Sequence, residues 1–256
     1  MDNIKIAKNE FIGFITLNNP ENLNVFSTPL ARELNDSLKE MDEDKQIRVV
    51  VINAEGKGFS AGIDMNELKD KTFEEYYETT TLMEEMNLTI TRMKKPVIAS
   101  VHGFAVANGI GLAAVCDLAI AEEGTKFGAT AINVGLSCIG PSLAISKSLG
   151  RKKTLELLLT GKIIDAKEAE RIGLINMVAP KGELENETLK LANELAKKSP
   201  LALQITKRAF YKMADMEMEK ALEIANYAFS EICMLEDAKE GIDAFMKKRE
   251  PNWQMK

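Results

Sequence analysis

Several residue types are scarce in this sequence, and each scarcity argues against a class of protein. The 256 residues include one histidine and three cysteines. The cysteines show no Cys-x-x-Cys spacing, so we expect a reducing compartment rather than a disulfide framework, and we expect no metal site. Acidic residues outnumber basic ones, and the formal net charge is −6 at pH 7. Because phosphate binding needs clustered lysines and arginines, we expect neither nucleic acid nor an anionic membrane as a partner.

An uninterrupted hydrophobic run is missing too. The N-terminal segment MDNIKIAKNEFIGF carries scattered charges and no apolar centre, so no signal peptide is expected. Residues 96–121 are largely apolar, but His102, Asn108 and Asp117 interrupt them. Burying such polar groups in lipid costs on the order of several kcal/mol each. We therefore expect a soluble, cytoplasmic protein.

The segments that are present alternate between strand-like and helix-like patterns. The β-branched run RVVVINA (48–54) predicts a strand that is covered on both faces. Apolar spacing predicts a long helix over 73–93, and short strands are expected around 127–134. The alternation predicts an α/β core over residues 1–198, followed by a helical C-terminal region over residues 199–256.

Two glycine-containing loops follow predicted strands. The segment GKGFSAGID (56–64) presents the backbone amides of Ala61 and Gly62, and GFAVANGIG (103–111) opens a helix. The first amides of a helix are unpaired and lie at the positive end of its dipole. Each loop alone fits tight packing equally well. Together they favour an oxyanion hole, which needs two amide donors that hold a carbonyl oxygen gaining negative charge.

Several motifs, in order along the chain, resemble those of the crotonase superfamily, the enoyl-CoA hydratase/isomerase family. They are NPENLNV (19–25), GKGFSAGID (56–64), KPVIASVHGFAVANG (95–109), the Cys-Asp pair that follows, LTG (159–161) and EGIDAFMKKREPNW (240–253). The resemblance covers about residues 3–253. It implies an α/β fold, a crotonase-like spiral of ββα units with a C-terminal helical trimerisation region. It also implies a homotrimer or a dimer of trimers.

The resemblance further implies an acyl-CoA thioester as substrate or ligand, with no tightly bound cofactor. By position, it places the two oxyanion-hole amides at Ala61 and Asn108. Most relatives have glycine at the second position, and asparagine is the residue most tolerant of unusual backbone angles after glycine. The positions expected to contact coenzyme A are Leu23, Val25, Ala61, Ile63, Asp64, Met65, Phe245 and Lys248.

The sequence departs from the family at the acid/base positions. Hydratases of this family carry two glutamates where this chain has Gly111 and Ala131. A positioned carboxylate contributes roughly a hundredfold to ten-thousandfold to a proton transfer. We therefore expect ordinary enoyl-CoA hydration to be weak.

Other groups are considered as replacements. Glu67 stands three residues after Asp64, which is equally the spacing of a helix-capping pair. Cys138 precedes a predicted helix start that could lower the pKa of its thiol, although a buried packing role fits it better. Further candidates on the helices after the first loop are Tyr76, Tyr77 and Glu84. The single histidine, His102, is expected to be structural.

Three functions stay open at this point. The first is an enzyme that acts on an acyl-CoA by oxyanion stabilisation, through hydration, isomerisation, decarboxylation or thioester hydrolysis. The second is a non-catalytic acyl-CoA-binding carrier or regulator. The third, a structural trimer without a ligand, fits the two amide loops least well.

Overall fold

The chain is built around a six-stranded sheet, seen in a computed structural model that describes residues 3–256. The strands are β1 (Ile4–Asn9), β2 (Ile12–Leu17), β3 (Val49–Ala54), β4 (Val97–Val101), β6 (Leu118–Glu122) and β9 (Met177–Ala179), in the order β1-β2-β3-β4-β6-β9. The first pair is antiparallel and all the others are parallel. The predicted α/β class is therefore confirmed, because parallel neighbours need the crossover segments that the alternating pattern indicates.

A second, three-stranded sheet lies beside the first. It contains β5 (Phe104–Val106), β7 (Lys126–Gly128) and β8 (Ile163–Asp165), in the order β5-β7-β8. The prediction of short strands around 127–134 is only partly right. Residues Thr130–Val134 form a 3-10 helix, η3, that ends at Gly135 with a φ of 78°. A left-handed glycine of this kind terminates helical turns and does not continue a strand.

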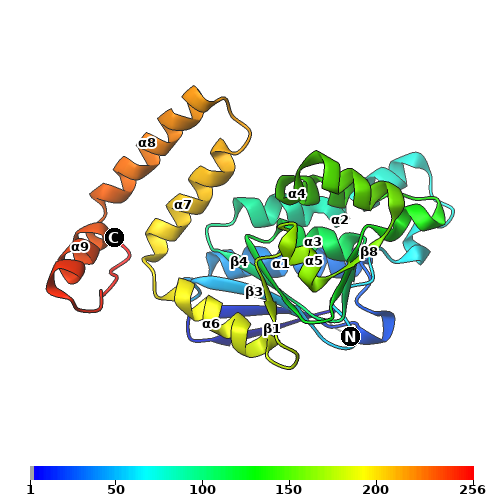
Figure 1. Cartoon of the computed structure of the whole chain (residues 1–256), viewed down its shortest axis with the longest axis horizontal. Coiled ribbons are helices and arrows are strands. Elements are labelled where there is room, and N and C mark those ends of the chain that lie inside the picture. Colours follow the sequence, from blue (N-terminus) through cyan, green and yellow to red (C-terminus); the bar gives the residue numbers. More distant parts are fainter. Residues whose placement is uncertain (1–2) are drawn as a thin grey trace.

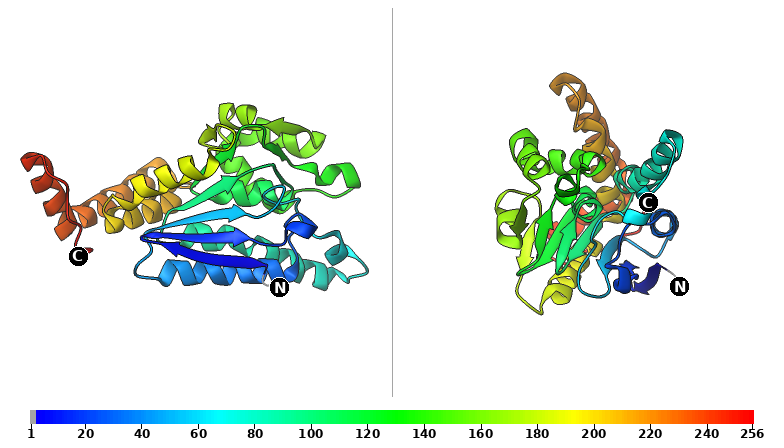
Figure 2. Two further views of the ribbon diagram at one scale, coloured as in Figure 1. Left: turned by 90° about the horizontal axis from the view of Figure 1, so that it is seen from below. Right: turned by 90° about the vertical axis from the view of Figure 1, so that its right-hand side faces the viewer.

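Helices cover both faces of the main sheet (Figures 1 and 2). They are α1 (Thr28–Glu43), α2 (Phe73–Arg92), α3 (Asn108–Val115), α4 (Ile139–Thr160), α5 (Ala166–Arg171) and α6 (Leu184–Ala196), with short 3-10 helices η1 (Pro20–Asn22) and η2 (Met65–Leu68). The larger core joins α1, α2 and α3 to one face of the sheet. Ala192 and Ala196 of α6 pack on the other face against Val49, Val51 and Ile98.

The helix α2 is well defined at its start and along its buried face. Thr72 and Glu75 form a reciprocal capping box, in which each side chain accepts a hydrogen bond from the other residue's backbone amide. Met83, Met86 and Ile90 recur at helical spacing and are buried in the core. This packing sets the rotation of α2 and therefore determines which of its polar residues face α3 and α4.

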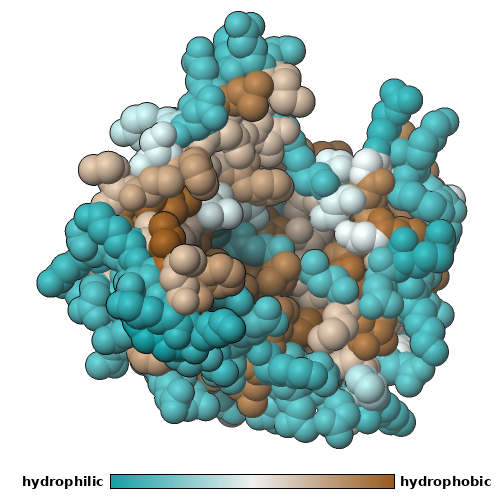
Figure 3. Space-filling model, turned by 60° about the vertical axis from the view of Figure 1, so that its left-hand side comes forward, coloured by the Kyte–Doolittle hydropathy of each residue, from teal (hydrophilic) through white to brown (hydrophobic). Residues whose placement is uncertain are grey.

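Three further helices form an arm that extends from the core (Figures 1 and 2). They are α7 (Pro200–Met213), α8 (Met218–Met234) and α9 (Glu236–Lys247). The boundary expected near residue 199 falls in the turn between α6 and α7. Figure 3, which brings the arm side forward, shows apolar side chains gathered around a hollow on this face. The exposed apolar residues of the arm are Phe210, Met216, Met218, Leu222, Tyr227, Phe229, Met234, Ile242, Phe245 and Met246.

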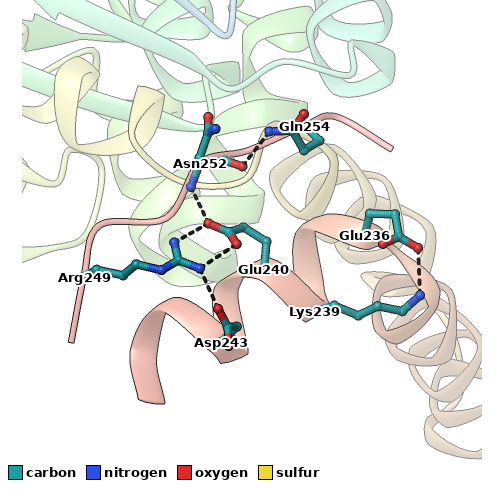
Figure 4. Close-up of a pocket in the computed structure, with 7 residues that line it drawn as sticks. All are labelled: Glu236, Lys239, Glu240, Asp243, Arg249, Asn252 and Gln254. Carbon is teal, nitrogen blue, oxygen red and sulfur yellow. Dashed lines mark hydrogen bonds and ion pairs between the residues drawn. The ribbon is translucent and has the colours of Figure 1, made fainter. Parts of the chain in front are cut away.

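The C-terminal tail is fastened to α9 by a compact ionic cluster (Figure 4). The Arg249 guanidinium donates to both carboxylate oxygens of Glu240, at 2.6 and 2.8 Å, and to Asp243 at 2.7 Å. Glu240 also accepts from the Asn252 amide at 2.7 Å. These contacts hold the pKa of Glu240 at about 2, with the Arg249 hydrogen bonds as the main cause. Because the charges in this pocket already pair with one another, the cluster serves to hold the tail.

No helix within residues 3–256 combines the length and the apolar character needed to cross a membrane. Within the same residues, no group of three or more His, Cys, Asp or Glu side chains is arranged to hold a metal ion.

Candidate functional site

The two predicted amide loops lie directly against each other. Ser60 and Ala105 form a parallel β-bridge, and the Val106 amide donates to the Ser60 carbonyl at 3.0 Å. Gly62 has a φ of 96°, and a Cβ at that position would lie 2.5 Å from the Ala107 Cβ. Only glycine fits this close approach. The loop after β3 and the start of α3 therefore form one continuous surface.

The free amides in these loops differ from the predicted pair. The Ala61 amide donates to the Leu23 carbonyl at 3.0 Å, so it is not available to a ligand in this structure. The amides on either side of Ile63 also have acceptors within the chain. Among residues 3–256, by contrast, no acceptor contacts the amides of Ile63 and Asn108. The prediction of Ala61 as an amide donor is therefore contradicted by its pairing, and the amides left unpaired are those of Ile63 and Asn108.

The reason for the shift is the pairing of Ile63 with a distant segment. Phe26 and Ile63 form a parallel bridge, with the Phe26 amide donating to Gly62 and the Asp64 amide donating to Phe26. In extended backbone, the amides of successive residues point to opposite sides of the strand. The Ile63 amide consequently points away from the segment that contains Phe26.

The turn before α3 aims the Asn108 amide. Ala107 has φ 49° and ψ −115°, a conformation that costs a residue with a side chain about 1–3 kcal/mol. Its amide donates to the Gly128 carbonyl at 2.9 Å, which helps to hold this geometry. The unusual backbone angles expected at Asn108 thus occur one residue earlier, and Asn108 is the first residue of the helix. A Cβ on Gly62 would lie 3.5 Å from the Asn108 nitrogen, so the two free amides belong to one small region.

Asn24 was not identified from the sequence, although it holds this region together. Its side chain is fully buried and donates to the carbonyls of Glu55 and Gly58, at 2.9 and 3.1 Å. The Asn24 carbonyl accepts from the Ser60 hydroxyl at 2.8 Å. The third asparagine of the NPENLNV motif was the available signal. Its role is to fix the loop that presents the Ile63 amide.

Residues 111 and 131, where the resemblance predicts glutamates, differ in the space available for a longer side chain. Gly111 is buried, and a Cβ there would lie 2.9 Å from the Pro141 Cβ and 3.1 Å from its Cα. Pro141, at the start of α4, therefore occupies the volume that a side chain at residue 111 would need. Ala131 lies in η3 and is partly exposed.

A carboxyl group reaches the site from α2 instead. Glu84, one of the candidates named from the sequence, accepts a hydrogen bond from the Asn108 side-chain amide at 3.0 Å. It accepts a second from the Asn87 side-chain amide at 2.7 Å. The Glu84 carboxyl packs onto Gly140, where any Cβ would overlap it. Burial raises the pKa of Glu84 above the ordinary glutamate value, and the hydrogen bond from Asn87 opposes this only in part.

Cys138 and Glu67, the replacements for the acid/base groups that the sequence analysis placed first, lie in environments that do not favour proton transfer. Cys138 is buried next to the site, and burial raises the pKa of its thiol, contrary to the lowering suggested for a helix start. The Glu67 carboxylate accepts from the Thr28 amide at 2.9 Å and from the Lys71 ammonium at 3.2 Å. The Thr28 amide, together with Lys71, lowers the pKa of Glu67. Glu67 thus anchors the start of α1 as an ionised group, while Asp64 caps η2.

The remaining candidates are not linked to Glu84 or Asn108. The Tyr76 hydroxyl donates to the Leu68 carbonyl at 2.9 Å, and Tyr77 is 66% exposed. His102 is hydrogen-bonded through Nε2 to the Gly56 carbonyl at 3.0 Å. These contacts give the three side chains no role in the geometry around the free amides.

The positions expected to contact coenzyme A fall into two groups. Leu23 and Val25 lie beside Ala61, Ile63, Asp64 and Met65, since the segment 23–26 is hydrogen-bonded to the segment 61–64. Leu23 is 39% and Met65 51% exposed, so their side chains are accessible. Phe245 and Lys248 lie in α9 and at its end, on the far part of the arm (Figures 1 and 2). The structure therefore brings the first group together and leaves the second apart from it.

Comparison with known proteins places these features in context. The sequence profile described as "Enoyl-CoA hydratase/isomerase" matches residues 7–256. The mouse protein "Enoyl-CoA hydratase domain-containing protein 3, mitochondrial" is 36% identical over 240 residues, which is 93% of this chain and 80% of that protein. A "Putative enoyl-CoA hydratase" of Thermus thermophilus is 35% identical over 94% of this chain and 97% of its own length.

Solved structures agree with these sequence relationships. An enoyl-CoA hydratase of Mycobacterium smegmatis superposes with a TM-score of 0.95 at 34% identity, covering 98% of both chains. The human enoyl-CoA hydratase domain-containing protein 3 also gives a TM-score of 0.95, at 33% identity, covering 98% of this chain and all of that one. The expected spiral architecture is therefore confirmed at the level of the whole fold.

Proposed function

This chain belongs to the enoyl-CoA hydratase/isomerase family, and from that premise we propose that it binds an acyl-CoA thioester and stabilises its enolate with the amides of Ile63 and Asn108. The observation that carries the proposal is the pair of amides without acceptors, on two loops in direct contact. The thioester carbonyl oxygen accepts both hydrogen bonds. Negative charge develops on that oxygen when the neighbouring carbon loses a proton or another group, and the fixed donors stabilise the charge as it forms.

The acyl-CoA lies along the surface formed by Leu23, Val25 and the residues from Ala61 to Met65. Asp64 keeps its capping role in η2 and can also contact the ligand. Phe245 and Lys248 are too far along the arm to join this surface within one chain, so we propose that they come from a neighbouring copy. The exposed apolar residues of the arm support self-association, which we propose produces a trimer or a dimer of trimers.

Ordinary enoyl-CoA hydration is expected to be weak, because neither Gly111 nor Ala131 supplies a carboxyl group. Decarboxylation or thioester hydrolysis would need different groups beside the oxygen, although decarboxylation forms an enolate without a base. A second candidate function is a non-catalytic acyl-CoA carrier or regulator. It is favoured by the environments of Glu67, which is held ionised, and of Cys138, whose thiol pKa is raised.

The experiment that tests the amide pair compares ligands that differ in one oxygen. Acyl-CoA thioesters of short, medium and long chain are titrated calorimetrically beside matched thioether analogues that lack the carbonyl. Two hydrogen bonds of about 1 kcal/mol each predict roughly thirtyfold tighter binding of the thioester. The infrared band of the labelled thioester carbonyl is expected to move to lower frequency on binding. Equal affinities and an unmoved band would remove the oxyanion hole from the proposal.

A further inference from the structure

A carboxyl group without a cation lies beside the free amides. Within residues 3–256, no lysine, arginine or histidine nitrogen lies within 4.0 Å of Glu84, whereas its neighbour Glu85 is paired with Lys39. Its two oxygens accept only from the side-chain amides of Asn108 and Asn87. A half-buried carboxylate held only by neutral donors is costly, and carboxyl groups in such environments are candidates for chemistry.

The surroundings of Glu84 show that the chain makes room for this group. Gly140 lies against the carboxyl, and any larger residue there would overlap it. Asn87 Oδ1 is buried and, among the residues described, has no hydrogen-bond partner. An open acceptor beside a carboxyl can accept a hydrogen bond from the protonated acid or from a water molecule. A purely structural role for Glu84 would not explain why residue 140 is a glycine or why Asn87 Oδ1 has no partner among the residues described.

The elements packed against α2 bring no compensating charge to Glu84. Helix α3 contains no titratable side chain, and the turn before α4 contributes only Cys138, whose thiol is buried. On the α1 side, Lys39 is paired with Glu85 at 2.8 Å. On the α7 side, Lys207 is paired with a buried aspartate at 2.6 Å. The residues one turn away from Glu84 on α2 have no titratable side chains.

We propose that Glu84 is the proton-transfer carboxyl of this site, acting at the carbon next to the thioester of a bound acyl-CoA. The proposal rests on the proposed function, because Asn108 connects the two. Its backbone amide binds the thioester oxygen, while its side-chain amide holds the Glu84 carboxyl. Glu84, which lies on α2, thereby supplies the proton-transfer carboxyl that Gly111 and Ala131 cannot supply.

The chemistry balances with this one group. The Glu84 carboxylate takes a proton from the carbon next to the thioester, and the electron pair of that C–H bond forms the enolate, whose negative oxygen is held by the two amides. Return of the proton to the same carbon regenerates the ligand. In a β,γ-unsaturated acyl group, return of the proton to the γ-carbon moves the double bond to the α,β position. Because the proton is removed and returned by one carboxyl, double-bond migration fits this site better than hydration does.

Deuterium exchange tests the proposal directly. Saturated and β,γ-unsaturated acyl-CoAs of short, medium and long chain are incubated with the full-length protein in D₂O, and mass spectrometry measures deuterium uptake and double-bond position. Glu84→Gln is expected to reduce exchange roughly a hundredfold to ten-thousandfold, with little change in acyl-CoA affinity. Glu85→Gln, the exposed neighbour paired with Lys39, is the matched control and should exchange normally.

The pH profile provides a second readout that loss of structure would not reproduce. Exchange by the wild-type protein should rise with pH as Glu84 ionises, whereas the residual exchange of Glu84→Gln should lack that rise. Glu84→Asp, which shortens the reach, should bind the ligand and exchange more slowly. Unreduced exchange in Glu84→Gln would overturn the proposal.

Failure of this proposal can be told apart from failure of the proposed function. A wild-type protein that binds thioesters, lowers the carbonyl frequency and takes up no deuterium would overturn the role of Glu84 and leave the amide pair standing. A protein that binds no member of the panel would overturn both.

Discussion

The Lys207 ammonium lies 2.6 Å from the Asp117 carboxylate, and this buried pair joins the arm to the core. Lys207 also donates to the Lys95 carbonyl at 2.8 Å, and the Tyr211 hydroxyl donates to the second oxygen of Asp117 at 2.9 Å. Asp117 in turn accepts from the Val97 amide at 2.7 Å, at the start of β4. The position of α7 against the sheet is therefore fixed by one aspartate that accepts hydrogen bonds from both α7 and β4.

Removing the cation from this cluster should destabilise the whole protein. Lys207→Met leaves the buried Asp117 charge without its partner, and breaking a buried pair in this way costs roughly 3–5 kcal/mol. We expect a lower free energy of unfolding in urea and a lower midpoint temperature. Lys212→Met, at an exposed position on the same helix, should behave like the wild type. A Lys207→Met protein of unchanged stability would mean that the pair does not anchor the arm.

Introducing a glutamate at residue 111 should destabilise the protein for steric reasons. Gly111→Glu forces a side chain against Pro141, and overpacking of this kind costs about 1–3 kcal/mol or more. Ala131→Glu, at a partly exposed position, should be tolerated. We expect Gly111→Glu to unfold at lower temperature and to gain no hydratase activity, measured by loss of the conjugated thioester absorbance. A stable Gly111→Glu protein with hydratase activity would show that Pro141 yields readily.

The amino-acid sequence was sufficient for the fold class and for the location of the amide loops. The β-branched run at 48–54 became β3, and the helix expected over 73–93 is α2. These predictions succeeded because burial on both faces and helical periodicity are local patterns that report directly on their surroundings. The order of several motifs along the chain then connects the two loops to one family.

The choice between neighbouring amides could not be made in the same way. Whether Ala61 or Ile63 presents a free amide depends on the pairing of this loop with the segment around Phe26. By the two-residue periodicity of extended backbone, the amides of residues 61 and 63 are equivalent, and only the contact of the Ala61 amide with the Leu23 carbonyl separates them. The local sequence carries no signal for it. Likewise, Glu84 could not be separated from Glu67, because their environments depend on contacts with Asn108 and Thr28, respectively, far away in the chain.

The cysteines should differ in reactivity according to burial. Cys233 is exposed, whereas Cys116 and Cys138 are buried, and burial raises the pKa of both buried thiols. Only the thiolate reacts with alkylating reagents. We therefore expect iodoacetamide to modify Cys233 first in the native protein, with the other two modified only after unfolding, as followed by peptide mass spectrometry. Faster modification of Cys138 than of Cys233 would contradict this expectation and would make Cys138 a candidate nucleophile.

The exposed apolar face of the arm should determine the oligomeric state. Phe229 of α8 is 68% exposed, and a charge at this position would disfavour burial against another copy. We expect Phe229→Asp to lower the molar mass measured by light scattering from that of a trimer or larger assembly. Glu223→Gln, an exposed change on the same helix, is the control. A monomeric wild-type protein would contradict the proposed assembly.

Glu84 should make stability depend on pH in a direction opposite to that of an ion-paired acid. Because burial raises its pKa in the folded state, the folded protein holds this proton more tightly than the unfolded chain does. The resulting stabilisation is fully present below the ordinary glutamate pKa and is lost as pH rises through the raised value. Glu84→Gln removes this dependence. The stability of Glu84→Gln relative to wild type, from urea unfolding, should therefore increase between pH 4 and pH 8. A constant difference across that range would mean that Glu84 has the same pKa in the folded and unfolded states. That result would contradict the raised pKa that burial gives Glu84 in the folded protein.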